Sequence, residues 1–437
     1  MAFVNDIKKT IRYAKKNGVH AAYLAASERL SERRKKYAYE EPSPDEQKKQ
    51  REYVFNDHIT ISIAVPAYET DELFLQDLIL SVAEQTSCAD ELLIADASES
   101  DRVKKTVGEF SKEYDFIRYI KLPGNKGIAE NTNEALKYSS SMYTALLDHD
   151  DILTKDALYN VRKAIEDNDI LPYLVYTDED KCDQFAFNYF EPNIKKGPDP
   201  DMLFTNNYIC HLAVYRTDVI KELGLRHEFD GAQDYDLALR CFEKAMNDGK
   251  LEKLILHAPG VAYHWRSNAS STSEDPYNKL YAYEAGKTAA AEALKRYLTK
   301  INKEETEIPV EHSEHLGFYK ADYGEDFFSK RPDVGAVFGP VFDKGKICGG
   351  AMKADGSIIY EGLKEGYCGP RNVAAVLQRT EAGDIRNMLL SPSSGLEKPE
   401  TKDLSEDEIM KMSLELSGKL TDKGYVLLYD PGQRKEA

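Results

Sequence analysis

Two aspartates separated by a single residue come directly after an apolar segment of this chain. Asp148 and Asp150 follow the run Tyr143-Thr-Ala-Leu-Leu147, and a segment with helical spacing, Leu153-Thr-Lys-Asp-Ala-Leu158, comes next. If the apolar run is a strand, both carboxylates point to the same face of it. They can then bind a hard divalent cation together with the oxygens of a phosphate-bearing ligand. The alternative is a solvated acidic turn that caps the next helix.

The segments upstream alternate between strand-like and helix-like patterns. The runs 59–65, 91–95 and 116–120 are strand-like, and 72–83 and 128–138 have helical spacing. Such alternation predicts a mostly parallel sheet flanked by helices, in which ligands bind beyond the carboxyl ends of the strands. The polar residues expected at that edge are Tyr68, Asp96, Asn125 and Asp148.

Ordered motifs extend over residues 58–298. They are Val65-Pro-Ala-Tyr68, Ile94-Ala-Asp-Ala-Ser98, Asn125-Lys-Gly-Ile-Ala-Glu-Asn-Thr-Asn133, Leu147-Asp-His-Asp-Asp-Ile-Leu153, Tyr176-Thr-Asp-Glu-Asp-Lys181, Gly231-Ala-Gln-Asp-Tyr-Asp-Leu-Ala-Leu-Arg240 and Tyr263-His-Trp-Arg266. In this order and spacing they resemble the inverting family 2 glycosyltransferases, most of all the bacterial members that build surface polysaccharides. The resemblance implies an α/β domain of GT-A fold, with a Rossmann-like, mostly parallel central sheet flanked by helices.

Inverting transfer of a sugar from a nucleotide diphosphate needs a base for the acceptor hydroxyl and a group that stabilises the departing diphosphate. The resemblance implies that Asp234, at the start of an expected helix, is this base. Many family members have Glu where this chain has Gln233, and the missing charge should lower the pKa of the base. The alternative is that Asp234 and Asp236 only favour the helix N-terminus.

The acidic pair after the fourth strand-like run is the predicted metal site. Asp150 is expected to be a direct ligand of Mn²⁺ or Mg²⁺, with Asp148 beside it contacting the metal or the ribose. His264 resembles the histidine that completes the metal shell in several family members. A lone histidine is more often structural, so that alternative stays open.

By the same resemblance, the first strand ends bind the nucleotide. Asp96 is expected to hydrogen-bond the pyrimidine imide, so UDP-sugar and dTDP-sugar donors are both compatible. Gly127, lacking a Cβ, is expected to allow close approach of the base or ribose. Glu69 stands where many family members have Asn. The full nucleotide set is Pro66, Ala67, Tyr68, Glu69, Asp96, Asn125, Gly127 and Asp148.

A further acidic run, Asp178-Glu179-Asp180, follows the strand-like segment 173–177. These residues and Gln233 are expected to face the sugar or the acceptor, and a charged β-turn is the alternative. The segment 185–207 is expected to be a loop that lines the cleft. His211, just beyond it, is a further candidate for acceptor contact.

The length of 437 residues predicts more than one structural unit. We expect a basic helical extension and linker at 1–57, the catalytic domain at 58–299 and an accessory α/β unit at 300–437. The first can lie on an anionic membrane or pack on the catalytic domain. The last weakly resembles the later half of a second, degenerate glycosyltransferase module, and it is expected to serve packing, homodimer formation or acceptor binding without catalysis.

Composition excludes several classes of protein. A net charge of -18 argues against nucleic-acid binding. The six cysteines lack C-x-x-C spacing, so neither a disulfide framework nor a zinc cluster is indicated. Without a secretory signal or an apolar run of about 18 residues, we expect a cytoplasmic protein, at most peripheral on the inner face of the membrane.

The function predicted is metal-dependent inverting transfer of a sugar to a glycan or lipid-linked glycan acceptor. One alternative is a sugar-nucleotide-binding scaffold without catalysis, against which the intact Asp148, Asp150, Asp234 and His264 argue. Another is a nucleotidyltransferase, which would carry a glycine-rich, basic loop after its first strand. Residues 66–70 contain neither a glycine nor a basic side chain.

Overall fold

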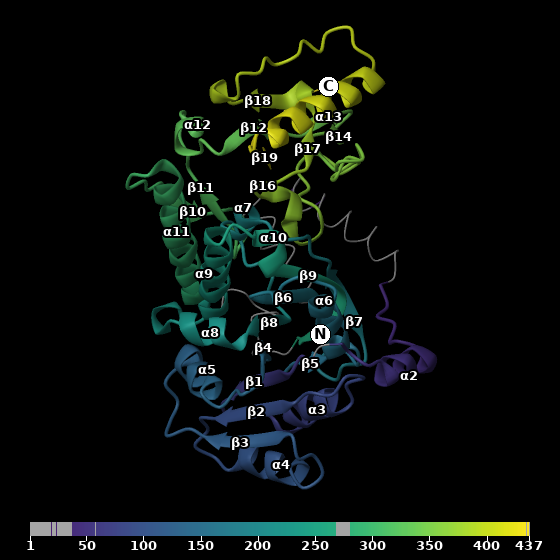
Figure 1. The fold of residues 1–437 in the computed structure, drawn as a ribbon, viewed down its shortest axis with the longest axis vertical. Coiled ribbons are helices and arrows are strands. Elements are labelled where there is room, and N and C mark those ends of the chain that lie inside the picture. The colour runs from purple at the N-terminus through teal and green to yellow at the C-terminus, as the bar shows by residue number, and fades with distance from the viewer. Residues whose placement is uncertain are drawn as a thin grey trace. The chain divides into compact units, whose positions relative to one another are not determined.

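The computed structural model describes residues 37–56, 58–267 and 280–433, with isolated positions at 19, 23, 435 and 436. The described chain forms two compact units, and Figure 1 gives the element labels. The first unit contains 37–198 and 207–293, and the second contains 199–206 and the chain from 294 onward. The basic extension expected before residue 37 lies outside the described residues.

The first unit is built on one mixed sheet in the strand order β3-β2-β1-β4-β8-β6-β9-β5, with β7 paired to β6. The strands from β3 to β4 are mutually parallel, and antiparallel pairing begins at β8. The predicted α/β fold class is therefore confirmed. The strands are β1 (Ile61–Ala67), β2 (Glu91–Asp96), β3 (Ile117–Lys121), β4 (Tyr143–Leu146), β5 (Ile152–Leu153), β6 (Leu174–Cys182), β7 (Tyr189–Asn193), β8 (Ala213–Arg216) and β9 (Ile255–Arg266).

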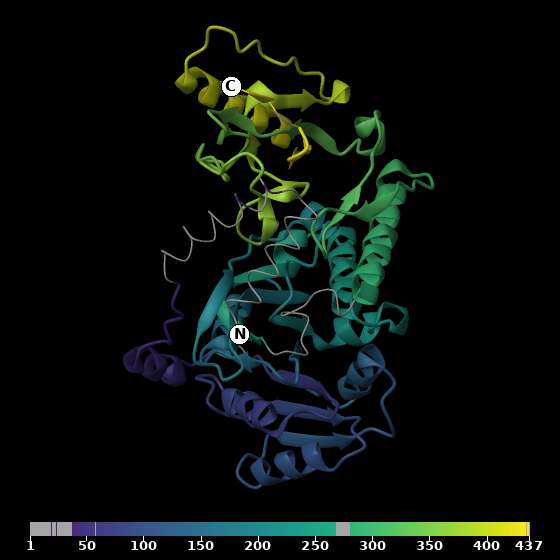
Figure 2. The ribbon, with the colours of Figure 1, turned by 180° about the vertical axis from the view of Figure 1, so that it is seen from behind.

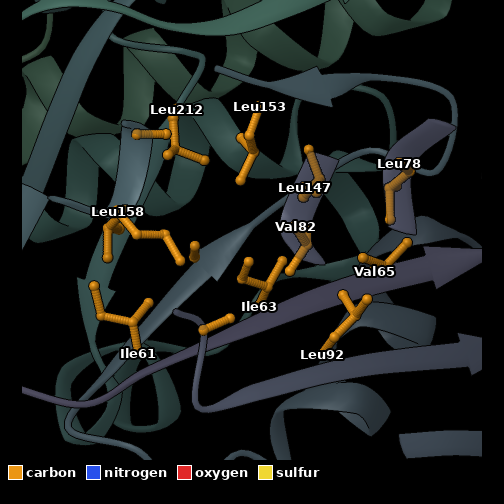
Figure 3. Close-up of a cluster of buried hydrophobic side chains, with 14 of the residues drawn as sticks. Ile61, Ile63, Val65, Leu78, Val82, Leu92, Leu147, Leu153, Leu158 and Leu212 are labelled. Carbon is orange, nitrogen blue, oxygen red and sulfur yellow. The ribbon is translucent and has the colours of Figure 1, made fainter. Parts of the chain in front are cut away.

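Helices pack against this sheet, and Figure 2 shows β1, β2 and β3 side by side with neighbouring helices. In the core, Ile63 and Val65 of β1 pack with Leu78 and Val82 of the helix that follows (Figure 3). A strand buried on both faces is a nearly continuous apolar run, and in β1 only Ser62 interrupts it. The helices are α2 (Pro44–Glu52), α3 (Glu72–Ala83), α4 (Arg102–Phe110), α5 (Ile128–Leu136), α6 (Ala157–Glu166), α8 (Thr217–Leu223), η1 (His227–Phe229), α9 (Gln233–Asn247), α10 (Leu251–Leu254) and α11 (Leu280–Asn302), which extends into the second unit.

The segment before the first strand is a helix, whereas the sequence analysis treats it as linker. Helix α2 begins after Ser43, whose hydroxyl accepts a hydrogen bond from the Glu46 amide while the Glu46 carboxylate accepts one from the Ser43 amide. Pro44 occupies the first turn, where its missing N–H costs nothing. This capping box is a local signal that could have identified the helix.

The second unit combines small sheets with one long helix. Its main sheet has the order β16-β19-β12-β18, and Phe338, Ile385, Leu416 and Leu420 form part of its core. Its elements are α7 (Pro200–Leu203), β10 (Val310–His312), β11 (Tyr319–Ala321), α12 (Phe327–Lys330), β12 (Val334–Phe338), β13 (Val341–Asp343), β14 (Lys346–Gly349), β15 (Ala351–Met352), η3 (Pro370–Ala375), β16 (Gln378–Arg379), β17 (Ala382–Gly383), η4 (Ile385–Asn387), β18 (Met388–Leu390), η5 (Pro392–Ser394), α13 (Glu406–Asp422), β19 (Val426–Tyr429) and β20 (Lys435–Glu436).

A buried charge network explains why 199–206 belongs to the second unit. Asp201 accepts hydrogen bonds from Arg331 Nη1 at 2.6 Å and from Arg379 Nε at 2.8 Å. The Asp199 carboxylate accepts one from the Arg379 amide at 2.8 Å. Burial raises the pKa of Asp201, but the two arginines outweigh burial and hold that pKa at about 2. The predicted cleft-lining loop 185–207 is therefore interrupted by β7 and by this anchored segment.

We expect Asp201→Asn to destabilise the second unit, because it removes the buried carboxylate that Arg331 and Arg379 share and leaves the buried Arg331 with Asp333 as its partner. Losing one partner of a buried ion pair costs about 3–5 kcal/mol. Since the folded pKa is below the unfolded value of about 3.9, the contribution of Asp201 is present above pH ~4 and is lost as pH falls toward ~2. Urea unfolding followed by circular dichroism at neutral and acidic pH measures both effects.

A surface ion pair in the same unit supplies the control. Glu415 lies 4.0 Å from Lys411 on helix α13, and both side chains are exposed. Glu415→Gln should change stability by less than about 1 kcal/mol. Equal losses of stability in the two variants would contradict the role assigned to Asp201.

Candidate active site

The acidic turn after β4 contains half-buried carboxylates and one fully buried carboxylate. Asp148 and Asp150 are half-buried, whereas Asp151 is 1% exposed. Asp151 accepts hydrogen bonds from the Arg266 amide at 2.7 Å and from the Tyr263 hydroxyl. Burial, followed by the charges of Asp150 and Asp148, raises the pKa of Asp151 well above its usual range. Asp151 therefore anchors the turn, and Asp148 and Asp150 remain the two carboxylates that solvent reaches.

This anchoring also changes the secondary structure that follows. A helix is predicted to begin at Leu153. In the structure, Ile152 and Leu153 instead form β5, which pairs antiparallel with His264 and Tyr263. Helix α6 begins only at Ala157. The prediction for 153–156 is wrong because pairing with a strand more than a hundred residues later overrides local periodicity.

The Arg266 side chain fixes the backbone of the acidic turn. Its buried guanidinium donates to the Asp150 carbonyl at 2.7 Å, to the Gln184 carbonyl at 2.6 Å and to the Asp77 carboxylate at 2.9 Å. Its Cζ also lies 4.7 Å from the centre of the Phe74 ring. One side chain therefore fixes the turn, the β6–β7 connection and helix α3.

His264 is oriented by a carboxylate and covered by aromatic rings. Its Nδ1 donates to Asp180 Oδ1 at 2.5 Å, and Asp180 Oδ2 accepts from the Tyr37 hydroxyl at 2.6 Å. The imidazole centroid lies 4.6 Å from that of Tyr39 and 4.3 Å from that of Tyr189. Carboxylate–imidazole pairs orient metal-bound histidines in many proteins, and they serve equally well as structural contacts.

The ligand atoms of Asp148, Asp150 and His264 do not form a close group of three in this structure. Among the described residues, a group of three His, Cys, Asp or Glu ligand atoms lying within 4.8 Å of one another occurs elsewhere, and it does not include Asp148, Asp150 or His264. The two half-buried carboxylates suit Mn²⁺ or Mg²⁺, which take most of their ligands from oxygens of water and substrate. Asp148, Asp150 and His264 therefore stay predicted ligands.

The acidic run 178–180 lies inside β6, although the sequence analysis ends that strand at residue 177. The Asp178 carboxylate accepts from His257 Nε2, the Lys195 amide and the Gly260 amide, each at 2.8 Å. Burial raises the pKa of Asp178, but His257 and these amides outweigh it and lower the pKa. Glu179 pairs with the buried Lys195, whose Nζ is 3.4 Å away. These carboxylates are engaged by protein groups, which positions the strand.

Asp96 and Glu69 stabilise the first strand ends. Asp96, fully buried at the end of β2, accepts hydrogen bonds from the Tyr119 hydroxyl at 2.7 Å and the Ser98 amide at 2.8 Å. Glu69 accepts from the Ser100 amide at 2.9 Å and the Ser100 hydroxyl at 2.6 Å, and these bonds lower its pKa. Glu69 thus ties the ends of β1 and β2 together. Tyr68, beside it, is 45% exposed.

In this structure, the group that closely approaches Gly127 is the side chain of Asp230. Gly127 has φ +96°, and a Cβ added there would lie 2.0 Å from Asp230 Oδ2. The Asp230 carboxylate accepts a hydrogen bond from the Ala129 amide in the first turn of α5, at 3.0 Å. Asn125 Oδ1 accepts from the Gly127 amide at 3.1 Å. Glycine is therefore required at 127 so that Asp230 can reach this helix end.

Gly127→Ala should lower the free energy of unfolding of the first unit by about 2 kcal/mol, because the side chain meets Asp230 and the backbone conformation is strained. Fluorescence of the chain's one tryptophan, Trp265 in β9, follows unfolding of this unit in urea. Gly124→Ala is the control, since its Cβ would meet no atom within 4 Å. Equal midpoints for the two variants would disprove the explanation.

Asp234 and Asp236 have different surroundings at the start of α9. Asp236, 1% exposed, is bound by Arg240 Nη2 at 2.7 Å and by the Arg226 guanidinium. Burial raises the pKa of Asp236, but the arginines outweigh burial and lower it. Asp234 is half-buried and accepts a hydrogen bond from Asn207 Nδ2 at 2.9 Å. Asp234 is therefore the one of the two that is suited to act as a base.

Two other predicted acceptor residues flank this region. Gln233 Oε1 accepts a hydrogen bond from the Gly231 amide at 2.7 Å, which fixes the turn into α9. The His211 ring stacks on Tyr263, with centroids 4.7 Å apart. Asn207, Asp230 and Arg266 are not among the predicted site residues. Each forms a hydrogen bond with a residue that is distant in sequence, and such a pair leaves no local pattern.

The family described as Glycosyl transferase family 2 matches residues 62–224. The uncharacterized protein y4gI of Sinorhizobium fredii is 34% identical over 245 residues, which are 54% of this chain and 25% of that protein. The O-antigen biosynthesis protein RfbC of Myxococcus xanthus is 30% identical over 238 residues, 54% of this chain and 18% of that protein. The Escherichia coli UDP-Glc:alpha-D-GlcNAc-diphosphoundecaprenol beta-1,3-glucosyltransferase WfgD is 39% identical over 96 residues, 22% of this chain and 37% of that protein.

A crystal structure of Staphylococcus aureus TarS 1–349 in complex with UDP is 16% identical, with a TM-score of 0.39 over 55% of this chain and 72% of that chain. The chain spans 25% and 18% of the length of its first two relatives. The family match contains Asp96, Asp148 and Asp150 and ends before Asp234 and His264. The match to the family described as Glycosyl transferase family 2 is therefore confined to residues 62–224.

Proposed function

We propose that this protein transfers a sugar from a pyrimidine nucleotide-diphosphate donor to a glycan or lipid-linked glycan acceptor in cell-surface polysaccharide synthesis. The observation that carries the proposal is the acidic turn after β4. There Asp148 and Asp150 are half-buried, and Asp151 and Arg266 hold the backbone beneath them. A turn that only capped the next helix would not need a buried guanidinium to fix it. The family match and the similarity to the glucosyltransferase WfgD support the same reaction class, and the similarity to the O-antigen biosynthesis protein RfbC supports a role in polysaccharide synthesis.

The donor is proposed to bind at the ends of β1 and β2. The exposed Tyr68 ring offers a surface on which a pyrimidine can stack. Pro66 and Ala67 line the base, and Asp96 orients the neighbouring loop through its bonds to Ser98 and Tyr119. WfgD is named for a UDP-glucose donor, which favours uracil over thymine.

Asp148 and Asp150 would hold the divalent cation. When bound, it neutralises the charge that develops on the departing diphosphate. Asp234, oriented by Asn207, removes the proton from the acceptor hydroxyl. The acceptor oxygen forms the new bond to the anomeric carbon as the bond to the diphosphate oxygen breaks, and this single displacement inverts the configuration.

The alternative of a binding scaffold without catalysis makes a different prediction for the same protein. An enzyme and a binding scaffold would both bind a UDP-sugar and gain thermal stability in its presence. Only the enzyme releases UDP and extends an acceptor. Incubation with UDP-glucose, Mn²⁺ and a diphosphoundecaprenol-linked N-acetylglucosamine acceptor, with UDP-galactose, UDP-N-acetylglucosamine and dTDP-rhamnose in parallel, tests the proposal. Binding without UDP release for every donor would favour the scaffold.

A lipid-linked acceptor would require access to the cytoplasmic face of a membrane. Among the described residues, no helix is long and apolar enough to cross a membrane. We propose that membrane contact occurs through the basic residues before position 37, which anionic lipids attract. Flotation of the full chain with anionic and with neutral vesicles tests this assignment.

A further inference from the structure

A second cluster of possible metal ligands lies in the unit that follows the glycosyltransferase domain. Glu314, His315 and Cys368 offer a carboxylate oxygen, an imidazole nitrogen and a sulfur atom that all lie within 4.8 Å of one another. Among the residues that the structure describes, they form the group of three that meets this distance. None of them has a role in the proposed sugar transfer, so the cluster needs a separate explanation.

Each ligand-bearing loop is held by its own backbone. Glu314 and His315 lie in the turn between β10 and β11, where the Ser313 amide donates to the Phe318 carbonyl at 2.9 Å. The His315 ring meets the Phe318 ring at an angle of 75°. In the other loop, the Cys368 carbonyl accepts from the Ala374 amide at 2.9 Å. The backbone of each ligand-bearing loop is therefore hydrogen-bonded within the fold.

The spacing of the Glu314 and His315 ligand atoms fits a tetrahedral ion. His315 Nε2 lies 3.6 Å from Glu314 Oε1, which is too long for a hydrogen bond. Ligand atoms bound tetrahedrally at about 2.0–2.3 Å from an ion stand roughly 3.3–3.8 Å apart. The His315 side chain is 10% exposed and Glu314 is 68% exposed. The cluster thus combines a buried imidazole with an exposed carboxylate.

We propose that Glu314, His315 and Cys368 bind one Zn²⁺, with water as the fourth ligand. A thiolate and an imidazole favour Zn²⁺ over Mg²⁺ and Mn²⁺, which prefer sets made of oxygens. On binding, the Cys368 thiol gives up its proton and sulfur bonds to the ion. The ion links the β10–β11 turn to the loop before η3, which are far apart in sequence, and so stabilises this unit.

Cobalt substitution tests the site in the full-length protein. After treatment with a chelator, Co²⁺ titration should produce a thiolate-to-cobalt charge-transfer band that saturates at one ion per chain and disappears when Zn²⁺ is added. The band should be lost in Cys368→Ser and retained in Cys348→Ser, a control in the same unit. The Asp148–Asp150 turn offers no sulfur, so failure of the band leaves the proposed glycosyltransferase function untouched.

A second variant covers the case in which Cys368→Ser does not fold. Glu314 is exposed, so Glu314→Gln should leave the fold intact and weaken Zn²⁺ binding at least ~10-fold, as loss of even an outer-shell partner does. Zn²⁺ should also raise the melting temperature of the wild type. Absence of the cobalt band in the wild type, or equal Zn²⁺ affinity in Glu314→Gln, would overturn the proposal.

Discussion

Asp234→Asn is expected to lower the rate of sugar transfer by ~10²–10⁴ while leaving donor affinity nearly unchanged. The amide keeps the size of the side chain, but it cannot take the acceptor proton. The donor is proposed to be held by Asp148, Asp150 and the ends of β1 and β2, so its binding does not require this carboxylate. Calorimetry with UDP-sugar and measurement of product on the same preparation separate the two effects.

The control for Asp234→Asn is Asp218→Asn. Asp218 lies in the first turn of α8, as Asp234 lies in the first turn of α9, and it pairs with Arg216 at 2.7 Å. If helix-end electrostatics were the whole role of Asp234, both variants would lose a similar small amount of stability and keep activity. Near-normal transfer by Asp234→Asn would therefore refute its role as base, and collapse of donor affinity would place it at the diphosphate.

Asp150→Ala is expected to abolish the dependence of transfer on Mn²⁺ or Mg²⁺ and to lower the rate by at least ~10²-fold, since a bound cation contributes several kcal/mol to charge stabilisation. The fold should survive, because Arg266 bonds to the carbonyl of residue 150 and not to its side chain. Activity over a titration of Mn²⁺, with circular dichroism of the same sample, measures both outcomes.

Asp169→Ala provides the comparison for this metal experiment. Asp169 is an exposed carboxylate paired with Lys253 at 2.6 Å, outside the acidic turn. Its replacement should leave metal dependence and rate as in the wild type. If Asp150→Ala keeps the same Mn²⁺ activation as Asp169→Ala, the acidic turn is not the metal site.

Hydrophobic periodicity in the sequence predicted α3 and β1 correctly. The helical spacing of 72–83 gave α3 with the same bounds, and the apolar run after Ile59 gave β1. The carboxylates of Asp148 and Asp150 lie at the end of β4 as expected, because a strand followed by acidic residues is visible without tertiary information.

The elements that depend on distant partners were not predicted. Strand β6 continues through three acidic residues because His257, Lys195 and His264 bind their carboxylates from other parts of the chain. The assignment of 199–206 to the second unit depends on arginines more than a hundred residues later. Periodicity carries no information about such pairs, since each charged residue looks like surface when its partner is unknown.

The position of Arg266 makes three segments mechanically dependent on one another. Its guanidinium bonds to Asp150, to Gln184 between β6 and β7 and to Asp77 on α3, so moving any one of these strains the bonds to the other two. A ligand that orders the acidic turn must then also slow amide hydrogen exchange around Gln184 and Asp77. Because binding linkage is reciprocal, a substitution that loosens the Gln184 loop would weaken donor binding without touching the donor.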